Sequence, residues 1–137
     1  MEDRYLNLLA EAKAAGANSY SPYSRYPVGA AILWETGRIT TGCNVENSSY
    51  GLTVCAERNA IYKGICEGER KISALAVSVQ DSKMPSPCGA CRQVIREFAE
   101  ECPIILQNGE GKIAISSLRE LLPNSFGPEF LEKNERR

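Results

Sequence analysis

The chain has 137 residues, a length that suits one compact domain, and we expect residues 1–137 to form a single domain. It is 43% hydrophobic and 24% charged, which is typical of a globular protein that buries a core without disulfide bonds. The formal net charge of −1 argues against binding to extended nucleic acid duplexes. No signal-peptide pattern or membrane-spanning apolar run is present, so we expect a cytoplasmic protein without a membrane partner.

The N-terminal third is predicted to contain one helix and a pair of strands. Residues 3–15 carry apolar side chains at helical spacing, and Gly16 follows as a stop signal. After a loop at 19–27, strands are expected at 28–33 and 38–44, joined by a turn. Residues 44–54 are polar and are expected to form a loop.

Helices and strands alternate in the remainder of the chain. Helices are expected at 55–67 and 89–100, and strands at 72–79, 104–107 and 112–115. Ser117 and Glu120 have the spacing of a capping box, which predicts a short helix that ends before Pro123. The charged residues from Glu129 onward are expected to be mobile or helical. This order predicts an α/β fold, a three-layer sandwich with a mixed five-stranded sheet and helices on both faces.

Cysteine and histidine usage restricts the chemistry of any site. The chain has six cysteines and no histidine. In a reducing compartment the cysteines suit metal binding, catalysis or burial better than a disulfide framework. Because histidine is the commonest general base and metal ligand, its absence means that a zinc site here must use thiolates and carboxylates.

Two short motifs indicate a metal site at two helix starts. They are Cys55-Ala56-Glu57-Arg58 and Pro87-Cys88-Gly89-Ala90-Cys91-Arg92-Gln93. A Cys-x-x-Cys pair alone is compatible with a buried pair, a redox dithiol or half of a structural zinc site. The third cysteine, placed two residues before a glutamate, favours a catalytic zinc held by Cys55, Cys88 and Cys91.

A zinc enzyme that uses water as its nucleophile requires each of these parts. Zinc lowers the pKa of bound water to about 7, and three protein ligands leave the fourth position open for that water. Glu57 is expected to be the catalytic proton shuttle, because it lies beside a ligand without ligating the metal. Three thiolates leave the site negative, so we expect Arg58 and the helix N-terminus to compensate by supporting the sulfur atoms.

The order of ligand, glutamate and Pro-Cys-x-x-Cys is the signature of zinc-dependent nucleobase deaminases. With these motifs the chain resembles the small homotetrameric cytidine deaminases of pyrimidine salvage, from about Tyr20 to Phe130. Three further segments carry the resemblance: Tyr23-Ser24-Arg25-Tyr26-Pro27-Val28-Gly29-Ala30-Ala31, Gly42-Cys43-Asn44-Val45-Glu46-Asn47 and Leu121-Leu122-Pro123-Asn124-Ser125-Phe126. The resemblance implies a cytidine deaminase-like fold and one zinc ion per subunit.

The resemblance also implies a set of nucleoside-binding roles. Asn44 and Glu46 match the pair that holds the ribose 3′-hydroxyl, although residue chemistry alone favours a turn stabilised by these side chains. The backbone of Ala56 matches the donor to the pyrimidine carbonyl, and the carbonyl of Ser86 matches the acceptor for the leaving amine. Tyr26 stands at the base-stacking position, where the family usually has phenylalanine.

Two further positions are implied to act between subunits of a homotetramer. Phe126 matches an aromatic that covers the base in a neighbouring subunit's site, and Tyr50 matches a tyrosine that reaches a neighbour's site near the ribose 5′ end. Buried or surface structural roles are expected for the remaining cysteines, Cys43, Cys66 and Cys102.

The expected activity is hydrolytic deamination of cytidine and 2′-deoxycytidine to the uridine products, with release of ammonia. Deamination or amide hydrolysis of a modified cytosine nucleoside or a related base is the alternative within enzymes. A non-catalytic structural zinc or redox module, with Cys43 as a fourth ligand, is the alternative from another class. That module leaves Glu57 and Arg58 without a task, because a closed site needs only its four ligands.

Overall fold

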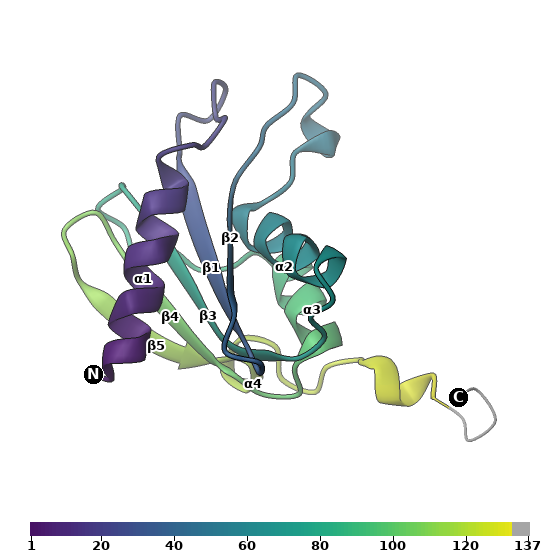
Figure 1. Cartoon of the computed structure of the whole chain (residues 1–137). Coiled ribbons are helices and arrows are strands. Elements are labelled where there is room, and N and C mark those ends of the chain that lie inside the picture. The colour runs from purple at the N-terminus through teal and green to yellow at the C-terminus, as the bar shows by residue number, and fades with distance from the viewer. Residues whose placement is uncertain (133–137) are drawn as a thin grey trace.

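The computed structural model describes residues 1–132 and forms a central sheet with helices on either side (Figure 1). In chain order the elements are α1 (Asp3–Gly16), β1 (Val28–Trp34), β2 (Ile39–Cys43), the 3-10 turn η1 (Tyr50–Leu52), α2 (Ala56–Cys66), β3 (Ile72–Val79), α3 (Gly89–Phe98), β4 (Pro103–Gln107), β5 (Ile113–Ser117), α4 (Leu118–Leu121) and η2 (Pro128–Phe130). Among these residues no helix is both long and apolar enough to cross a bilayer.

The sheet has five strands in the order β2-β1-β3-β4-β5. β3 and β4 are parallel, and every other neighbouring pair is antiparallel. The parallel pair requires a crossover, which α3 supplies between the two strands. The predicted mixed five-stranded sheet is therefore confirmed.

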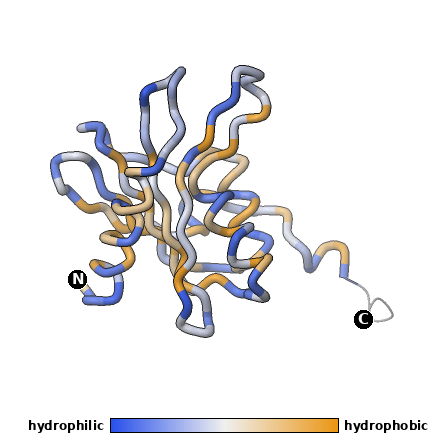
Figure 2. Tube along the Cα trace, turned by 45° about the horizontal axis from the view of Figure 1, so that its top comes forward, coloured by the Kyte–Doolittle hydropathy of each residue, from blue (hydrophilic) through white to orange (hydrophobic). Residues whose placement is uncertain are grey.

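Helices cover both faces of the sheet, which confirms the predicted three layers. α1 buries Leu8, Leu9 and Ala12 against one face, which is lined by small side chains such as Ala31 and Ala76. α2 and α3 pack on the other face over a larger core. Apolar segments gather at the sheet between these layers, whereas the loops are mostly hydrophilic (Figure 2).

Helix α2, which starts within the first motif, packs closely against the edge strand β2. A Cβ atom at Gly42 in β2 would lie only 2.5 Å from the Ala60 nitrogen, so the close approach of β2 to α2 requires glycine. Next to it, the buried Thr40 hydroxyl accepts a hydrogen bond from Trp34 Nε1 and donates one to the Ala60 carbonyl, both at 2.8 Å. These contacts set the position of α2, and therefore of the residues at its N-terminus.

The predicted elements agree with the structure except at their ends and in one loop. Cys55 precedes α2 as its N-cap, and α3 ends at Phe98 rather than at residue 100. The predicted loop at 44–54 contains the short turn η1. The predicted helix start is confirmed, because the Ser117 hydroxyl caps α4 by accepting a hydrogen bond from the Glu120 nitrogen at 3.2 Å. Of the segment from Glu129 onward, residues 133–137 lie outside the described part of the chain.

Candidate metal centre and substrate cavity

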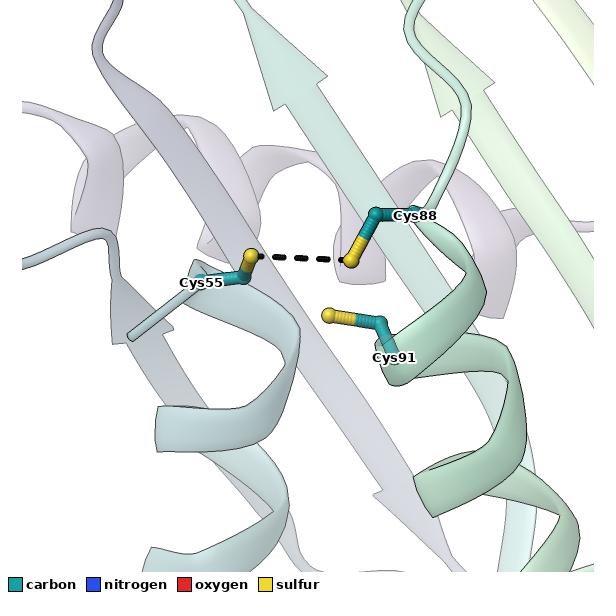
Figure 3. A group of neighbouring side chains, drawn as sticks. All are labelled: Cys55, Cys88 and Cys91. Atoms are coloured by element: carbon teal, nitrogen blue, oxygen red, sulfur yellow. Dashed lines mark hydrogen bonds between the residues drawn. The ribbon is translucent and has the colours of Figure 1, made fainter. Parts of the chain in front are cut away.

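Three cysteines from the two motifs meet where two helices begin. Cys55 is the N-cap of α2, Cys88 is the N-cap of α3, and Cys91 lies in the first turn of α3. Figure 3 shows their sulfur atoms pointing toward one another. All three lie within 4.8 Å of one another, and the Cys55 and Cys88 sulfurs are 3.8 Å apart.

This geometry fits a tetrahedral zinc ion. With Zn–S bonds of about 2.3 Å, tetrahedral ligand sulfurs lie about 3.8 Å apart, so the observed spacing needs little adjustment. The cluster is the one group of three or more potential ligand side chains of this kind found in residues 1–132. Since three ligands come from the protein, a fourth position remains for water or substrate.

The charges around the cluster favour a cation. A hydrogen bond from the Cys91 thiol, together with Arg58, lowers the pKa of Cys55 to about 5. The pKa of Cys91 is raised because its proton bonds to the Cys55 sulfur and because the thiol is buried. The Cys55 thiolate thus opposes ionisation of Cys91, and a divalent cation relieves that opposition by binding all three thiolates.

Arg58 lies against the cluster, as the sequence predicts. Its Nη2 donates a hydrogen bond to the Cys55 sulfur at 3.4 Å, and this contact raises the pKa of the guanidinium. Nε of Arg58 is buried without a hydrogen-bond partner among the described residues. The side chain therefore places positive charge beside a thiolate ligand.

Glu57 is a buried carboxylic acid in the first turn of α2, beside the metal cluster. The residue is only 5% exposed. Burial, and then the negative charge of Cys55, raise the pKa of Glu57 to about 7. A carboxyl group with this pKa can both accept and return a proton at neutral pH.

A cavity of about 250 Å³ opens beside the cluster. It is bounded by the first turn of α2, the segment before α3, the ends of β1 and β3, and the two loops that follow α1 and β2. Eight of the predicted site residues line it: Tyr26, Asn44, Glu46, Cys55, Ala56, Glu57, Ser86 and Cys88. Sequence reasoning missed other lining residues, among them Ser24, Thr53 and Pro85, whose positions carry no chemical signal of their own.

Asn44 and Glu46 organise the loop that carries Tyr26. The Asn44 side chain accepts from the Val28 nitrogen and donates to the Tyr26 carbonyl, both at 2.9 Å. The Glu46 carboxylate accepts from the Tyr23 and Ser24 nitrogens at 2.9 and 3.1 Å, and from the Ser24 hydroxyl. The turn-stabilising interpretation of these side chains is thus seen directly, and both side chains also face the cavity.

Two backbone groups in the cavity wall are free to bind a ligand. Ala56 is the first residue of α2, where amide groups have no partner within the helix. The Ser86 carbonyl accepts no hydrogen bond from residues 1–132, while the Ser86 hydroxyl accepts one from Arg92 Nη2 at 2.8 Å. The wall therefore offers one donor and one acceptor near Glu57.

Tyr50 and Phe126 do not line this cavity within the same chain. Tyr50 is 75% exposed and lies beside Tyr23, with ring centroids 5.9 Å apart. Phe126 is exposed and contacts Phe130 in the C-terminal segment. Both aromatic rings are available to another molecule, which is the arrangement that a shared site requires.

Comparison with known proteins decides the family. The model of the cytidine and deoxycytidylate deaminase zinc-binding region matches residues 2–106. The chain belongs to the cytidine and deoxycytidylate deaminase family. It is similar to a cytidine deaminase of Sporosarcina psychrophila, with 51% identity over 90% of this chain and 92% of the relative. A cytidine deaminase of Mycobacterium tuberculosis is 40% identical over 99% of this chain and 100% of its own length.

Solved structures of the family share the fold. A crystal structure of cytidine deaminase from Burkholderia pseudomallei has a TM-score of 0.85 and 40% identity, covering 92% of this chain and all of that one. The matched zinc-binding region of the deaminase family contains all three cysteines of the cluster. The chain is therefore a zinc-dependent deaminase, and a non-catalytic structural module is not favoured.

Proposed function

We propose that this enzyme hydrolyses free cytidine and 2′-deoxycytidine to uridine and 2′-deoxyuridine and releases ammonia. The observation that carries the proposal is the buried Glu57 beside the three-cysteine cluster, in the wall of the 250 Å³ cavity. The cytidine deaminases that resemble the chain over nearly its whole length support this substrate class.

Cys55, Cys88 and Cys91 hold the zinc ion in the proposed mechanism. When bound, zinc supplies a water that ionises near neutral pH. Glu57 would accept the two protons of the attacking water in turn and deliver one to the ring nitrogen and the other to the departing amine. Oxygen from water becomes bonded to C4 of the pyrimidine, and the C4–N bond breaks to give ammonia.

The rest of the cavity orients the base and the sugar. The free amide of Ala56 donates to the pyrimidine carbonyl, and the Ser86 carbonyl accepts from the amine that leaves. Tyr26 stacks on the base, since its ring lines the cavity. Asn44 and Glu46 bind the ribose 3′-hydroxyl with the bonding capacity that the Tyr26 loop leaves free, because a carboxylate offers about four acceptor positions and an amide two donors.

The proposal extends to the assembly and its setting. We place Phe126 and Tyr50 in the sites of neighbouring subunits of a homotetramer, where their exposed rings cover the base and the ribose 5′ end. We assign the enzyme to pyrimidine salvage in the cytoplasm, because its substrate is a free nucleoside.

Turnover of cytidine and deoxycytidine, followed by the ultraviolet change on formation of the uridine product, tests the proposal directly. In the same assay Glu57→Gln should keep its zinc and lose activity by about 10²–10⁴-fold, because the proton shuttle is gone and the side-chain shape is kept. Glu11→Gln, on exposed α1 surface, is the matched control and should be unchanged. Absence of turnover with both nucleosides, or full activity of Glu57→Gln, would contradict the proposal.

A further inference from the structure

Arg96 is a buried arginine in the metal-bearing helix α3, on the side of the C-terminal segment. Its residue exposure is 7%. Nε donates to the Ser125 hydroxyl at 2.9 Å, and Nη2 donates to the Glu129 carboxylate. Because a buried guanidinium is costly unless it is paired, these two contacts define where the segment lies relative to α3.

The C-terminal strap, residues 122–132, follows α3 through further contacts. Gln93 Nε2 donates to the Phe126 carbonyl at 2.9 Å. At Gly127 the backbone approaches so closely that an added Cβ would lie 2.4 Å from Cζ of Arg96. The guanidinium therefore fills the space under the extended segment that contains Phe126 and Gly127.

The strap presents two aromatic rings to solvent. Phe126 is 54% exposed and Phe130 is 63% exposed, with ring centroids 5.1 Å apart. The C-terminal part of the strap projects away from the body of the domain in Figures 1 and 2. Because these rings are more than half exposed, we expect their position to depend on the polar contacts that α3 makes with the strap.

We propose that Arg96 is a positioning residue that fixes the strap so that Phe126 reaches the cavity of a neighbouring subunit. The inference rests on the proposed function of Phe126 as the cover of a neighbour's base. Arg96 contacts neither the cysteine cluster nor Glu57, so its effect passes through Phe126 and through substrate binding. Loosening the strap should therefore raise KM and leave kcat and zinc content nearly unchanged.

Arg96→Lys keeps the charge and loses the two-pronged geometry that reaches both Ser125 and Glu129. We expect its KM for cytidine to rise about three- to tenfold, which is the effect of losing one or two hydrogen bonds. Gly127→Ala should displace the Arg96 guanidinium from the strap, because the added Cβ would collide with it, and should raise KM to a similar extent. Arg119→Lys is the matched control, because this exposed arginine lies beside Arg96 and should leave KM unchanged.

Combination with Phe126→Ala separates positioning from general destabilisation. If Arg96 acts through Phe126, Arg96→Lys should add no further rise in KM to the Phe126→Ala enzyme. Amide hydrogen exchange of residues 122–132 should also be faster in Arg96→Lys, and the rest of the chain should be protected as before.

The outcomes distinguish the two levels of the proposal. If Phe126→Ala raises KM and Arg96→Lys either leaves KM and strap exchange unchanged or adds its full effect to the double variant, the Arg96 inference alone is overturned. If Phe126→Ala leaves KM unchanged, the shared-site role of Phe126 is wrong and the inference falls with it. If the unmodified enzyme turns over neither nucleoside, the proposed function itself is wrong.

Discussion

Replacing Thr40 with valine should loosen the attachment of α2, the helix that carries Glu57, to the sheet. Valine keeps the shape of threonine and removes the hydroxyl. The change deletes two hydrogen bonds of 2.8 Å, one from Trp34 Nε1 and one to the Ala60 carbonyl. Trp34 is 1% exposed, so no water can replace the lost partner of its indole N–H.

The expected cost follows from these two losses. A buried donor left without a partner costs about 1–3 kcal/mol, whereas the Ala60 carbonyl loses only one of its acceptor contacts and adds about 0.5–1 kcal/mol. We therefore expect Thr40→Val to reduce the free energy of unfolding by about 1.5–4 kcal/mol. In a Trp34→Phe background the same change should cost less, because the donor that it leaves unpaired is absent.

Urea unfolding monitored by circular dichroism measures this effect, with the fluorescence of Trp34, the only tryptophan, as a second probe. Zinc and protein concentrations must be held equal, since ligand binding and association stabilise the folded state. Thr41→Val is the control, because the Thr41 hydroxyl makes no hydrogen bond within the described residues. A loss below about 0.5 kcal/mol for Thr40→Val, or an equal loss for Thr41→Val, would refute the reasoning.

Two further changes test the metal site and the core. Arg58→Ala should weaken zinc binding about 10–100-fold, which chelator competition measures, and should raise the acidic pKa of the pH–rate profile. If zinc affinity and the pH–rate profile are both unchanged, Arg58 does not support the Cys55 thiolate. Burial, and then Glu101, raise the pKa of Cys102 to about 12. As the pH rises, the Cys102 thiol ionises in the unfolded chain before it ionises in the folded protein. The free energy of unfolding should therefore be unaffected by this group below about pH 9, and should fall between pH 9 and pH 12 by up to about 1.4 kcal/mol per pH unit. In urea unfolding across this pH range, the free energy of unfolding of Cys102→Ala should fall less steeply than that of the unmodified protein. Equal slopes for the two proteins would contradict the prediction.

The elements of the fold follow from local patterns, and their arrangement in the sheet does not. Alternation and apolar runs locate all five strands, and the capping box locates α4, because each signal lies within a few residues. The pairing of β1 with β3 joins residues that are distant in the sequence, such as Ala31 with Ala76. The spacing of residues in the sequence does not tell which strands pair, because the pairing depends on how helices pack against both faces of the sheet.

The metal site could be predicted from the sequence because its chemistry needs particular residue types at fixed spacing within two short segments. The two motifs predict the meeting of Cys55, Cys88 and Cys91, and the position of Glu57 beside them. Arg96 is different, because it lies in a helical segment where an arginine is ordinarily solvent-exposed, and only the fold shows that the strap covers it. Contacts of this kind depend on where two distant segments meet.

The meeting of two helix starts at one cluster has a consequence for chain connectivity. Cys55 and Cys88 are 33 residues apart, and β3, the middle strand of the sheet, lies between them. A zinc ion bound to both closes this loop as a removable cross-link. For a loop of this length the chain-entropy relation for cross-links gives about 4 kcal/mol of stabilisation. Loss of the metal would therefore lower the free energy of unfolding of the domain as well as stop the chemistry.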